Sequence, residues 1–383
     1  MTTTKVRVPY SYLNIQLAKG TALHDTILAE WAEVLESGLF TLGPAVGRLE
    51  KAWAEYVGTK HAIAVNSGTD ALIIAMKALG IGPGDEVITC PNTFVATVGA
   101  IVAVGAKPVF VDAGPDYLMD IEQINKVHTP HTKAVLPIDL TGKPASDFTD
   151  VPVDLAIMAN LEKPLYIIRD ACQSIGARMF GKSSGKFADL AAYSMHPLKN
   201  VHASNDGGML VTDNDEWASF ARLYRNHGLS DRDHVDIPGI NSRLDTIGAV
   251  AAYHVLKNVE DITLKRNANA KQYDAGLKNI RQVTLPPRPG PEVRQAFHTY
   301  VVLTERRDEL KAYLLDKGVQ CAIHYPIPVH LQKGYAYLGY KKGDFPVVEY
   351  QAEHQLTLPI HEFLEPDQIE YVIECVKDFY VGR

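Results

Sequence analysis

An aspartate and a lysine stand just beyond two hydrophobic segments of this chain, where they could act together on a ligand. Asp170 follows the segment 164–169 and precedes Gln173 by three positions, and Lys199 follows the segment 189–195. Open α/β sheets bind ligands in the crevice beyond the carboxyl ends of their strands, so we expect both side chains to point into one crevice. Each residue alone has a simpler explanation, because a strand-end aspartate is commonly a cap and most lysines are solvated surface charges.

The segments that must position these residues predict an α/β fold. Short apolar runs bounded by Gly, Pro and Asn are typical of strands, and in the first half of the chain they alternate with helical segments. This is the pattern of a mostly parallel central sheet with helices covering its faces. The predicted strands are residues 61–66, 85–90, 107–112, 133–138, 164–169, 189–195 and 207–212.

Apolar residues at helical spacing predict the helices, and a change of pattern predicts two domains. The expected helices are residues 21–37, 46–58, 70–80 and 91–104. We expect a large α/β domain over residues 1–250. A smaller C-terminal α+β domain over residues 251–383 should follow, with a soft boundary between the two.

Composition excludes several classes of function. The 383 residues are 46% hydrophobic and 22% charged, as in an ordinary soluble protein, and the net charge of −7 argues against nucleic-acid binding. The four scattered cysteines suit a reducing compartment. With no signal-peptide pattern and no membrane span, we expect a cytoplasmic protein. His324 and His330 are separated by prolines and lack a carboxylate at ligand spacing, so we expect no metal site.

A second motif competes for the same stretch of chain. Residues 176–183 match the phosphate-loop pattern G-x-x-x-x-G-K-[ST], which requires a strand before the first glycine and a helix at the lysine. Here the strand ends several residues too early, and a Gly- and Ser-bearing turn follows Lys182. Without a helix N-terminus to hold phosphate, we interpret the match as accidental.

Three motifs taken together are far more specific. D-x-x-Q after a hydrophobic strand, then S-x-H-P-x-K-N, then D-G-G before an apolar strand, resemble the pyridoxal-phosphate sugar aminotransferases of the DegT/DnrJ/EryC1/StrS family. These belong to the fold type I, aspartate aminotransferase-like enzymes, and the resemblance covers nearly the whole chain. It implies pyridoxal 5′-phosphate as cofactor, in its PLP and PMP forms.

The resemblance implies a role for each residue around the cofactor ring. Lys199 would form the Schiff base and then move the α-proton of the substrate, because burial and a nearby cation lower the pKa of such a lysine. Asp170 would pair with the pyridine nitrogen, so that the ring can accept electrons. Gln173 would lie by the phenolic oxygen, and Phe94 would stack on the ring.

The resemblance also implies a phosphate site and a dimer. Gly68 and Thr69 open a buried helix in the motif N-S-G-T-x-A-L, where free backbone N–H groups and the helix dipole favour an anion. A plain capped helix explains that pair equally well on local grounds. In the family this turn cradles phosphate, the hydroxyl of Ser194 binds it too, and Asn226 reaches the phosphate of the neighbouring subunit. We therefore expect a homodimer with shared active sites.

Two positions depart from the pattern of the relatives. Asp139 stands where they commonly carry His, so a contact with substrate or cofactor could differ here. Asn205 replaces a glycine before the acid of D-G-G, in a turn that Asn tolerates because it accepts left-handed backbone. His196, three residues before the lysine, could relay protons or simply pack.

The C-terminal half suggests the substrate. N-S-R-L-D, H-Y-P-x-P-x-H-L-Q and G-D-F-P look most like the branch that aminates C3 of nucleotide-linked keto sugars. This implies pocket roles for Asn241, Arg243, His324 and Tyr325. The leading hypothesis is transfer of an amino group from an amino acid, glutamate by family resemblance, to a 3-keto-6-deoxyhexose nucleotide. Transfer to a 4-keto sugar nucleotide or a keto-cyclitol, or a catalytically silent PLP-binding regulatory protein, are the alternatives. The intact lysine favours transamination over the dehydration of relatives that have His there.

Overall fold

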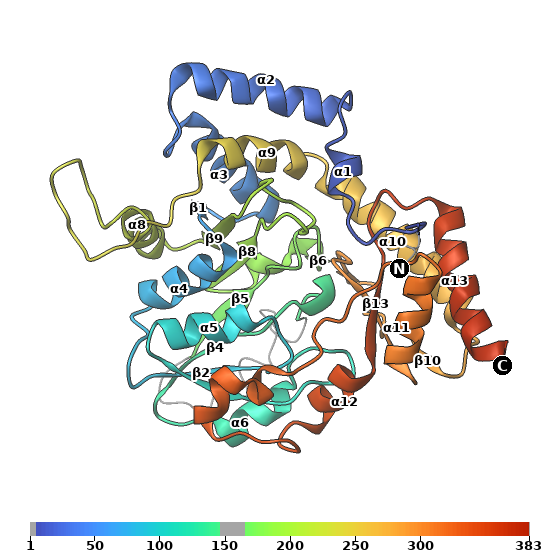
Figure 1. Cartoon of the computed structure of the whole chain (residues 1–383). Helices are drawn as coiled ribbons and strands as arrows, with labels where there is room; N and C mark the ends of the chain where they lie inside the picture. Colours follow the sequence, from blue (N-terminus) through green and yellow to red (C-terminus); the bar gives the residue numbers. More distant parts are fainter. Residues whose placement is uncertain (1–4, 146–164, 383) are drawn as a thin grey trace.

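A seven-stranded sheet forms the centre of the protein in a computed structural model, which describes residues 5–145 and 165–382 (Figure 1). The strand order is β1-β9-β8-β5-β4-β2-β3. In chain order the strands are β1 (His61–Val65), β2 (Glu86–Thr89), β3 (Lys107–Phe110), β4 (Thr132–Val135), β5 (Tyr166–Asp170), β8 (Leu190–Ser194) and β9 (Gly208–Thr212). The predicted strands are therefore confirmed to within three residues at each end, except that Pro164, the first residue of one of them, lies outside the described ranges.

The sheet is mixed rather than wholly parallel. The pairs β2–β3, β2–β4, β4–β5 and β5–β8 are parallel, whereas β9 runs antiparallel to both of its neighbours, β8 and β1. The predicted mostly parallel α/β fold is thus confirmed. The run of residues 195–207, which carries Lys199, turns the chain back on itself between β8 and β9, so that β9 pairs antiparallel with β8.

Helices cover both faces of the sheet, as alternation along the strands requires. Ile63 and Val65 of β1 pack towards α4, whereas Ala62 and Ala64 belong to the hydrophobic cluster formed with α3 and α9. These helices, with their neighbours, are α2 (Ala22–Ser37), α3 (Pro44–Val57), α4 (Gly68–Ala78), α5 (Val95–Ala103), α8 (Asp215–Tyr224) and α9 (Thr246–Leu256).

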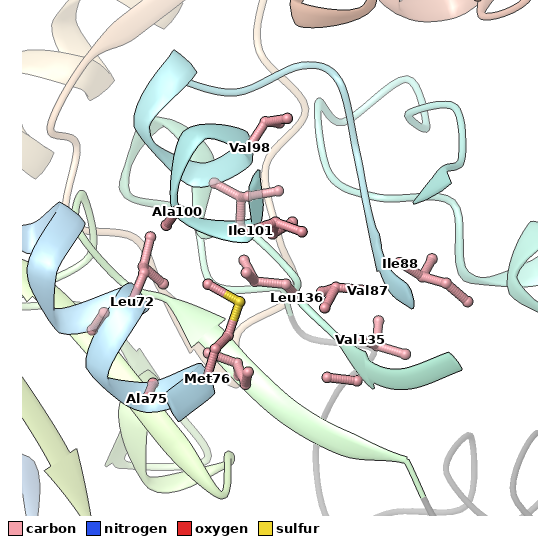
Figure 2. Close-up of a cluster of buried hydrophobic side chains, with 14 of the residues drawn as sticks. Leu72, Ala75, Met76, Val87, Ile88, Val98, Ala100, Ile101, Val135 and Leu136 are labelled. Atoms are coloured by element: carbon pink, nitrogen blue, oxygen red, sulfur yellow. The ribbon is translucent and has the colours of Figure 1, made fainter. Parts of the chain in front are cut away.

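Figure 2 shows the core between the sheet and helices α4 and α5. Leu72 and Met76 of α4 and Ile101 of α5 are almost fully buried and face Val87 of β2 and Leu136 beyond β4. Each fully buried side chain of this kind stabilises the fold by about 1.5–3 kcal/mol. The rigidity of this layer fixes the strand ends that carry the candidate site.

Local capping explains where the helices begin and end. Thr21 caps α2 by accepting a hydrogen bond from the His24 amide, and α2 stops at Gly38 with φ of 67°. The Ser67 hydroxyl caps α4 by accepting from the Asp70 amide, so α4 begins earlier than predicted. The helix predicted from residue 91 begins only at Val95.

A second sheet lies in the C-terminal part of the chain, with α10, α11 and α13 packed around it (Figure 1). Its strands are β10 (Val283–Thr284), β12 (Tyr300–Thr304) and β13 (Gln355–Leu358), and its helices are α10 (Val259–Leu277), α11 (Arg307–Asp316) and α13 (Pro366–Val381). Two further segments pack against the sheet of the other part of the chain. Val8 packs with the second sheet, whereas Val329 and Phe345, the latter just before α12 (Pro346–His354), pack with the first. The division at residue 250 stays a prediction.

The remaining elements are short. They are α1 (Leu13–Gln16), α6 (Ile124–Val127) and the small sheet of β6 (Arg178–Met179), β7 (Lys182–Ser183) and β11 (Val293–Arg294). The β6–β7 hairpin occupies the phosphate-loop match, with Phe180 and Gly181 both at positive φ in its turn. Only a 3₁₀ turn, Ser184–Lys186, follows β7, so the rejection of the phosphate-loop reading is confirmed. Within the described ranges, no helix combines the length and the apolar content needed to cross a bilayer.

Candidate active site

Asp170 and Lys199 lie at the carboxyl ends of two adjacent parallel strands. Asp170 is the last residue of β5 and pairs with Ala192 of β8, after which the chain turns at residues 195–199. Burial lowers the pKa of the Lys199 amine, and the charges of Cys172 and Asp170 oppose that shift. The structure thus brings the predicted acid and lysine together at the ends of adjacent strands.

The Asp170 carboxylate is held at both oxygens. Oδ2 accepts a hydrogen bond from Thr97 Oγ1 at 2.7 Å, and Oδ1 accepts from the Cys172 amide at 3.1 Å. Thr97 in turn shares a 2.7 Å hydrogen bond with Thr93. With only 6% of its surface exposed, the carboxylate is fixed for a partner that approaches from the crevice.

Gln173 connects the strand end to an aromatic wall. Its Oε1 accepts from the Thr141 amide at 2.8 Å, which leaves its Nε2 to donate to Tyr325 Oη at 3.4 Å. The Tyr325 ring lies 5.6 Å from that of Phe94, centroid to centroid. Phe94 precedes α5 in extended backbone and is 52% exposed, so its ring is available to a flat ligand.

The turn that is expected to bind phosphate lies directly beside the end of β8. A Cβ atom added to Gly68 would come within 2.8 Å of Cys172 Sγ and 2.9 Å of Ser194 Cβ. The amides of Gly68 and Thr69 begin α4 and have no acceptor inside the helix. Three of the predicted cofactor contacts therefore meet at one point.

Asn226, Asn241 and Arg243 form a separate group at the end of β1. Arg243 Nη1 donates to Asn226 Oδ1 at 3.0 Å, and isolated bridges join Asn226 to Asn241 and Arg243 to Val65. All three come from one chain, so the contact of Asn226 with a neighbouring subunit stays a prediction.

His324 lies on the Lys199 side of the crevice. Its Nδ1 shares a 2.9 Å hydrogen bond with Thr357 Oγ1, and its ring stacks on Tyr10 with centroids 6.1 Å apart. Burial, with a smaller effect of Lys199, lowers the pKa of His324 to about 4. His330 pairs instead with Glu349 at 3.1 Å, so the two histidines do not converge. No group of three or more His, Cys, Asp or Glu side chains in the described residues could hold a metal ion.

The two departures from the family pattern prove to be structural. Asp139 points into the interior and pairs with Arg169 at 2.8 Å, both side chains being fully buried. Asn205 donates to Asp245 at 2.6 Å, and the left-handed residue of its turn is Ser204, with φ of 63°. The turn therefore tolerates Asn205 as expected, although Asn205 itself does not adopt left-handed backbone. Asp112 also serves the fold, because it accepts from the amides that begin α12.

Sequence reasoning missed several residues beside the lysine. Cys172 stands inside the D-x-x-Q motif, and its place two residues after the aspartate was a usable signal. Tyr12 donates to the Lys199 carbonyl at 3.2 Å. His298 lies close enough that Lys199, after burial, is the next contribution to lowering its pKa well below the ordinary value. The last two come from distant parts of the chain and carried no local signal.

Comparison with known proteins identifies the family. The pattern of the DegT/DnrJ/EryC1/StrS aminotransferase family matches residues 21–377. This chain belongs to that family. The resemblance seen in the sequence is thus confirmed, and with it membership of a family of PLP-dependent sugar aminotransferases.

Two relatives and one solved structure show how close the match is. A dTDP-3-amino-3,4,6-trideoxy-alpha-D-glucose transaminase from Streptomyces venezuelae is 38% identical over 374 residues, covering 97% of this chain and 96% of that protein. A pleiotropic regulatory protein from Geobacillus stearothermophilus is 38% identical over 362 residues, covering 94% and 95%. The crystal structure of S. venezuelae DesV in complex with ketimine intermediate superposes with a TM-score of 0.92 at 37% identity, covering 98% and 99% of the two chains.

Proposed function

We propose that this protein passes an amino group from L-glutamate to a nucleotide-linked keto sugar, using PLP held by Lys199. The acceptor we propose is a 3-keto-6-deoxyhexose. The observation that carries the proposal is the meeting of a fixed carboxylate, Asp170, with a lysine of lowered pKa at adjacent strand ends. The name of the S. venezuelae relative, a 3-amino sugar transaminase, favours C3 over a 4-keto sugar or a keto-cyclitol.

The residues present fit PLP. The close approach of Gly68 to Cys172 and Ser194 leaves room for backbone amides to meet a phosphate, but no room for a side chain. Phe94 offers an exposed ring for stacking, and the Asp170 carboxylate is already positioned by Thr97. Such a donor set suits an anionic phosphate on an aromatic ring whose nitrogen carries a proton.

Each residue then has a defined task. When bound, PLP supplies an electron sink for the charge that develops at the substrate carbon. Lys199 would take the proton from that carbon and deliver it to the former aldehyde carbon of the cofactor, and its lowered pKa increases the share of neutral amine available as base. Asp170 accepts a hydrogen bond from the ring nitrogen and keeps that nitrogen protonated. Gln173 and Tyr325, which are hydrogen-bonded to each other, would orient the ring oxygen.

The visible absorption spectrum tests this proposal. Purified protein supplemented with PLP should show an absorption band at the short-wavelength end of the visible range. The band should fade when L-glutamate is added and return when the keto sugar is supplied. The variant Lys199→Ala should lack the band, and Lys51→Ala, at an exposed site on α3, is the control. A wild-type protein that shows no band with PLP would refute the proposal.

The proposed assembly is a homodimer whose active sites are shared. Asn226 would reach the phosphate of the neighbouring subunit, whereas Lys199 would act in its own. Mixing Lys199→Ala with Asn226→Ala subunits should then restore activity, because one site of each hybrid dimer receives both wild-type residues. If the mixture stays as inactive as its parents while hybrid dimers form, the sites are not shared.

A catalytically silent regulator is the second candidate, favoured by the name of the Geobacillus stearothermophilus relative. It predicts a PLP band that no amino donor affects. The intact set of Lys199, Asp170 and Gln173 argues against it, and the same titration with a panel of amino acids separates the two.

A further inference from the structure

A short segment, residues 295–299, ties the two halves of the candidate site together. We refer to it as the 295–299 strap, and it leads from β11 into β12. The Ala296 amide donates to the Gly142 carbonyl at 2.8 Å, beside the Thr141 amide that holds Gln173. On the other side, Asn200 Nδ2 donates to the Ala296 carbonyl at 3.1 Å, next to Lys199 in sequence. The strap is therefore connected by hydrogen bonds to the turn that holds Gln173 and to the residue that follows Lys199.

A buried ion pair and a strained residue fix the orientation of the strap. Arg266 is paired with Glu362 at 2.8 Å, and its Nη1 donates to the Phe297 carbonyl at 3.1 Å. Phe297 has φ of 48°, a left-handed backbone conformation that is rare and strained for a bulky residue. Its ring packs in the C-terminal core against Tyr300. Such strain persists where the surrounding structure demands one geometry, and it sets the direction of the next side chain, His298.

The His298 ring has no hydrogen-bond partner among residues 5–145 and 165–382. Its Nδ1 is buried and unpartnered, and no described residue bonds to Nε2. Burial lowers the pKa of this imidazole well below its ordinary value, and the charges of Lys199 and Arg266 and the rings of His324 and His196 act in the same direction. The ring is thus neutral near pH 7. Because buried N–H groups without partners are rarer than buried acceptors without partners, we assign the proton to Nε2.

We propose that His298 is a substrate-binding residue of the transamination, donating a hydrogen bond from Nε2 to an oxygen on the carbon next to the reacting carbon. The inference rests on the proposed function. In the amino donor that oxygen belongs to the α-carboxylate, and in the keto sugar it belongs to the hydroxyl beside the keto group. Both substrates enter the same crevice in turn. A neutral donor suits this position because it adds no second cation next to Lys199.

Binding of two non-reactive probes tests the proposal without relying on turnover. Glutarate carries a carboxylate like that of the amino donor, and dTDP-glucose carries sugar hydroxyls without a keto group. Their dissociation constants would be measured by calorimetry on the PLP-loaded protein, for wild type, His298→Leu and His298→Gln. The leucine removes the donor, whereas the glutamine amide can still reach an acceptor. Thr299→Val is a matched control on the same strap, because the buried Thr299 hydroxyl has no partner.

We expect His298→Leu to weaken at least one probe about tenfold, the loss of one hydrogen bond, with the PLP band unchanged. His298→Gln should recover part of that loss, and Thr299→Val should bind like wild type. Loss of glutarate alone assigns the bond to the amino donor, and loss of dTDP-glucose alone assigns it to the sugar. Unchanged binding of both probes in His298→Leu would overturn the inference. Equal losses in His298→Leu and Thr299→Val would also overturn it, because the strap would then be merely structural. A wild-type protein that binds the probes but never transaminates would instead refute the proposed function.

Discussion

Replacing Asp139 by leucine should destabilise the protein strongly, because it removes the carboxylate that pairs with the buried Arg169 cation. The Asp139 carboxylate accepts hydrogen bonds from Arg169 at 2.8 Å, Ser174 Oγ at 2.6 Å and the Ala145 amide at 2.9 Å. Neither Asp139 nor Arg169 has any exposed side-chain surface. Removing one partner of such a pair costs about 3–5 kcal/mol. The Ser174 hydroxyl and the Ala145 amide, which lose their acceptor, add to this cost. That is a large share of the roughly 5–15 kcal/mol that holds a typical protein folded.

The double variant Asp139→Leu/Arg169→Met is the informative control. It removes both charges together, and well-packed apolar replacements of a buried pair are often neutral or stabilising. We therefore expect its free energy of unfolding to lie much closer to that of wild type than that of Asp139→Leu. Glu353→Ala breaks the exposed pair with Lys342, and it should change stability by less than about 1 kcal/mol.

Urea denaturation at pH 7, followed by fluorescence and checked for reversibility, measures all three variants. If Asp139→Leu loses less than about 1 kcal/mol, the other hydrogen bonds of Arg169, among them those to the Ala145 and Phe187 carbonyls, compensate its charge. If the double variant is less stable than the single one, the pair stabilises the fold by itself, and the reasoning from desolvation is wrong. PLP affinity of the double variant should remain within a few-fold of wild type, because the contact to the Asp170 carbonyl is made by the Asp139 amide, at 3.0 Å.

Three further outcomes follow from the geometry. Gly68→Ala should weaken PLP binding by about 1–3 kcal/mol in a titration by absorbance, since the new methyl would lie 2.9 Å from Ser194 Cβ. Adding Cys172→Ala should restore only part of the affinity, and wild-type binding by Gly68→Ala alone would contradict the cradle. In PLP-free protein, Lys199 should be acylated at lower pH than surface lysines, because burial lowers its pKa, and mass spectrometry of peptides labelled between pH 7 and about 10 would show this. Identical profiles would refute it. The free energy of unfolding should fall as pH decreases from about 6.5 to about 4. In this range the unfolded chain binds protons at three histidines that stay neutral in the folded protein. Equal urea midpoints at pH 7.5 and 5 would contradict this. Those histidines, each with a pKa lowered to about 4, are His202, His324 and His361.

The central sheet could be predicted from the sequence because its strands are short apolar runs with clear boundaries. What the runs did not reveal was direction, which depends on the connection and not on the strand. The antiparallel setting of β9 follows from the way residues 195–207 turn the chain back, and the pattern of apolar residues within β9 does not encode it. Helix starts were misplaced for a similar reason. Ser67 caps α4 through its side chain, and Phe94 stays extended before α5, with φ of −66° and ψ of 143°.

The residues of the candidate site also differ in whether the local sequence or only the fold reveals their role. Asp170, Gln173 and Lys199 belong to motifs within one stretch of chain, so the resemblance of those motifs to the family was enough to select them. Asp139 was selected for a different reason, its departure from relatives, and only the fold shows that it faces Arg169 and not the crevice.

His298 marks the limit of what the sequence alone could predict. Nothing in the run Ala-Phe-His-Thr-Tyr distinguishes this histidine from one that packs in a strand. Its significance arises from hydrogen bonds that join the strap to Gly142 and to Asn200, residues that only the fold brings to it. A residue whose partners are all distant in sequence leaves no periodic or motif-based signal, because each contact is fixed by tertiary packing. Unsatisfied buried nitrogen atoms and positive φ at bulky residues are the observations that reveal such positions, and both meet at Phe297 and His298.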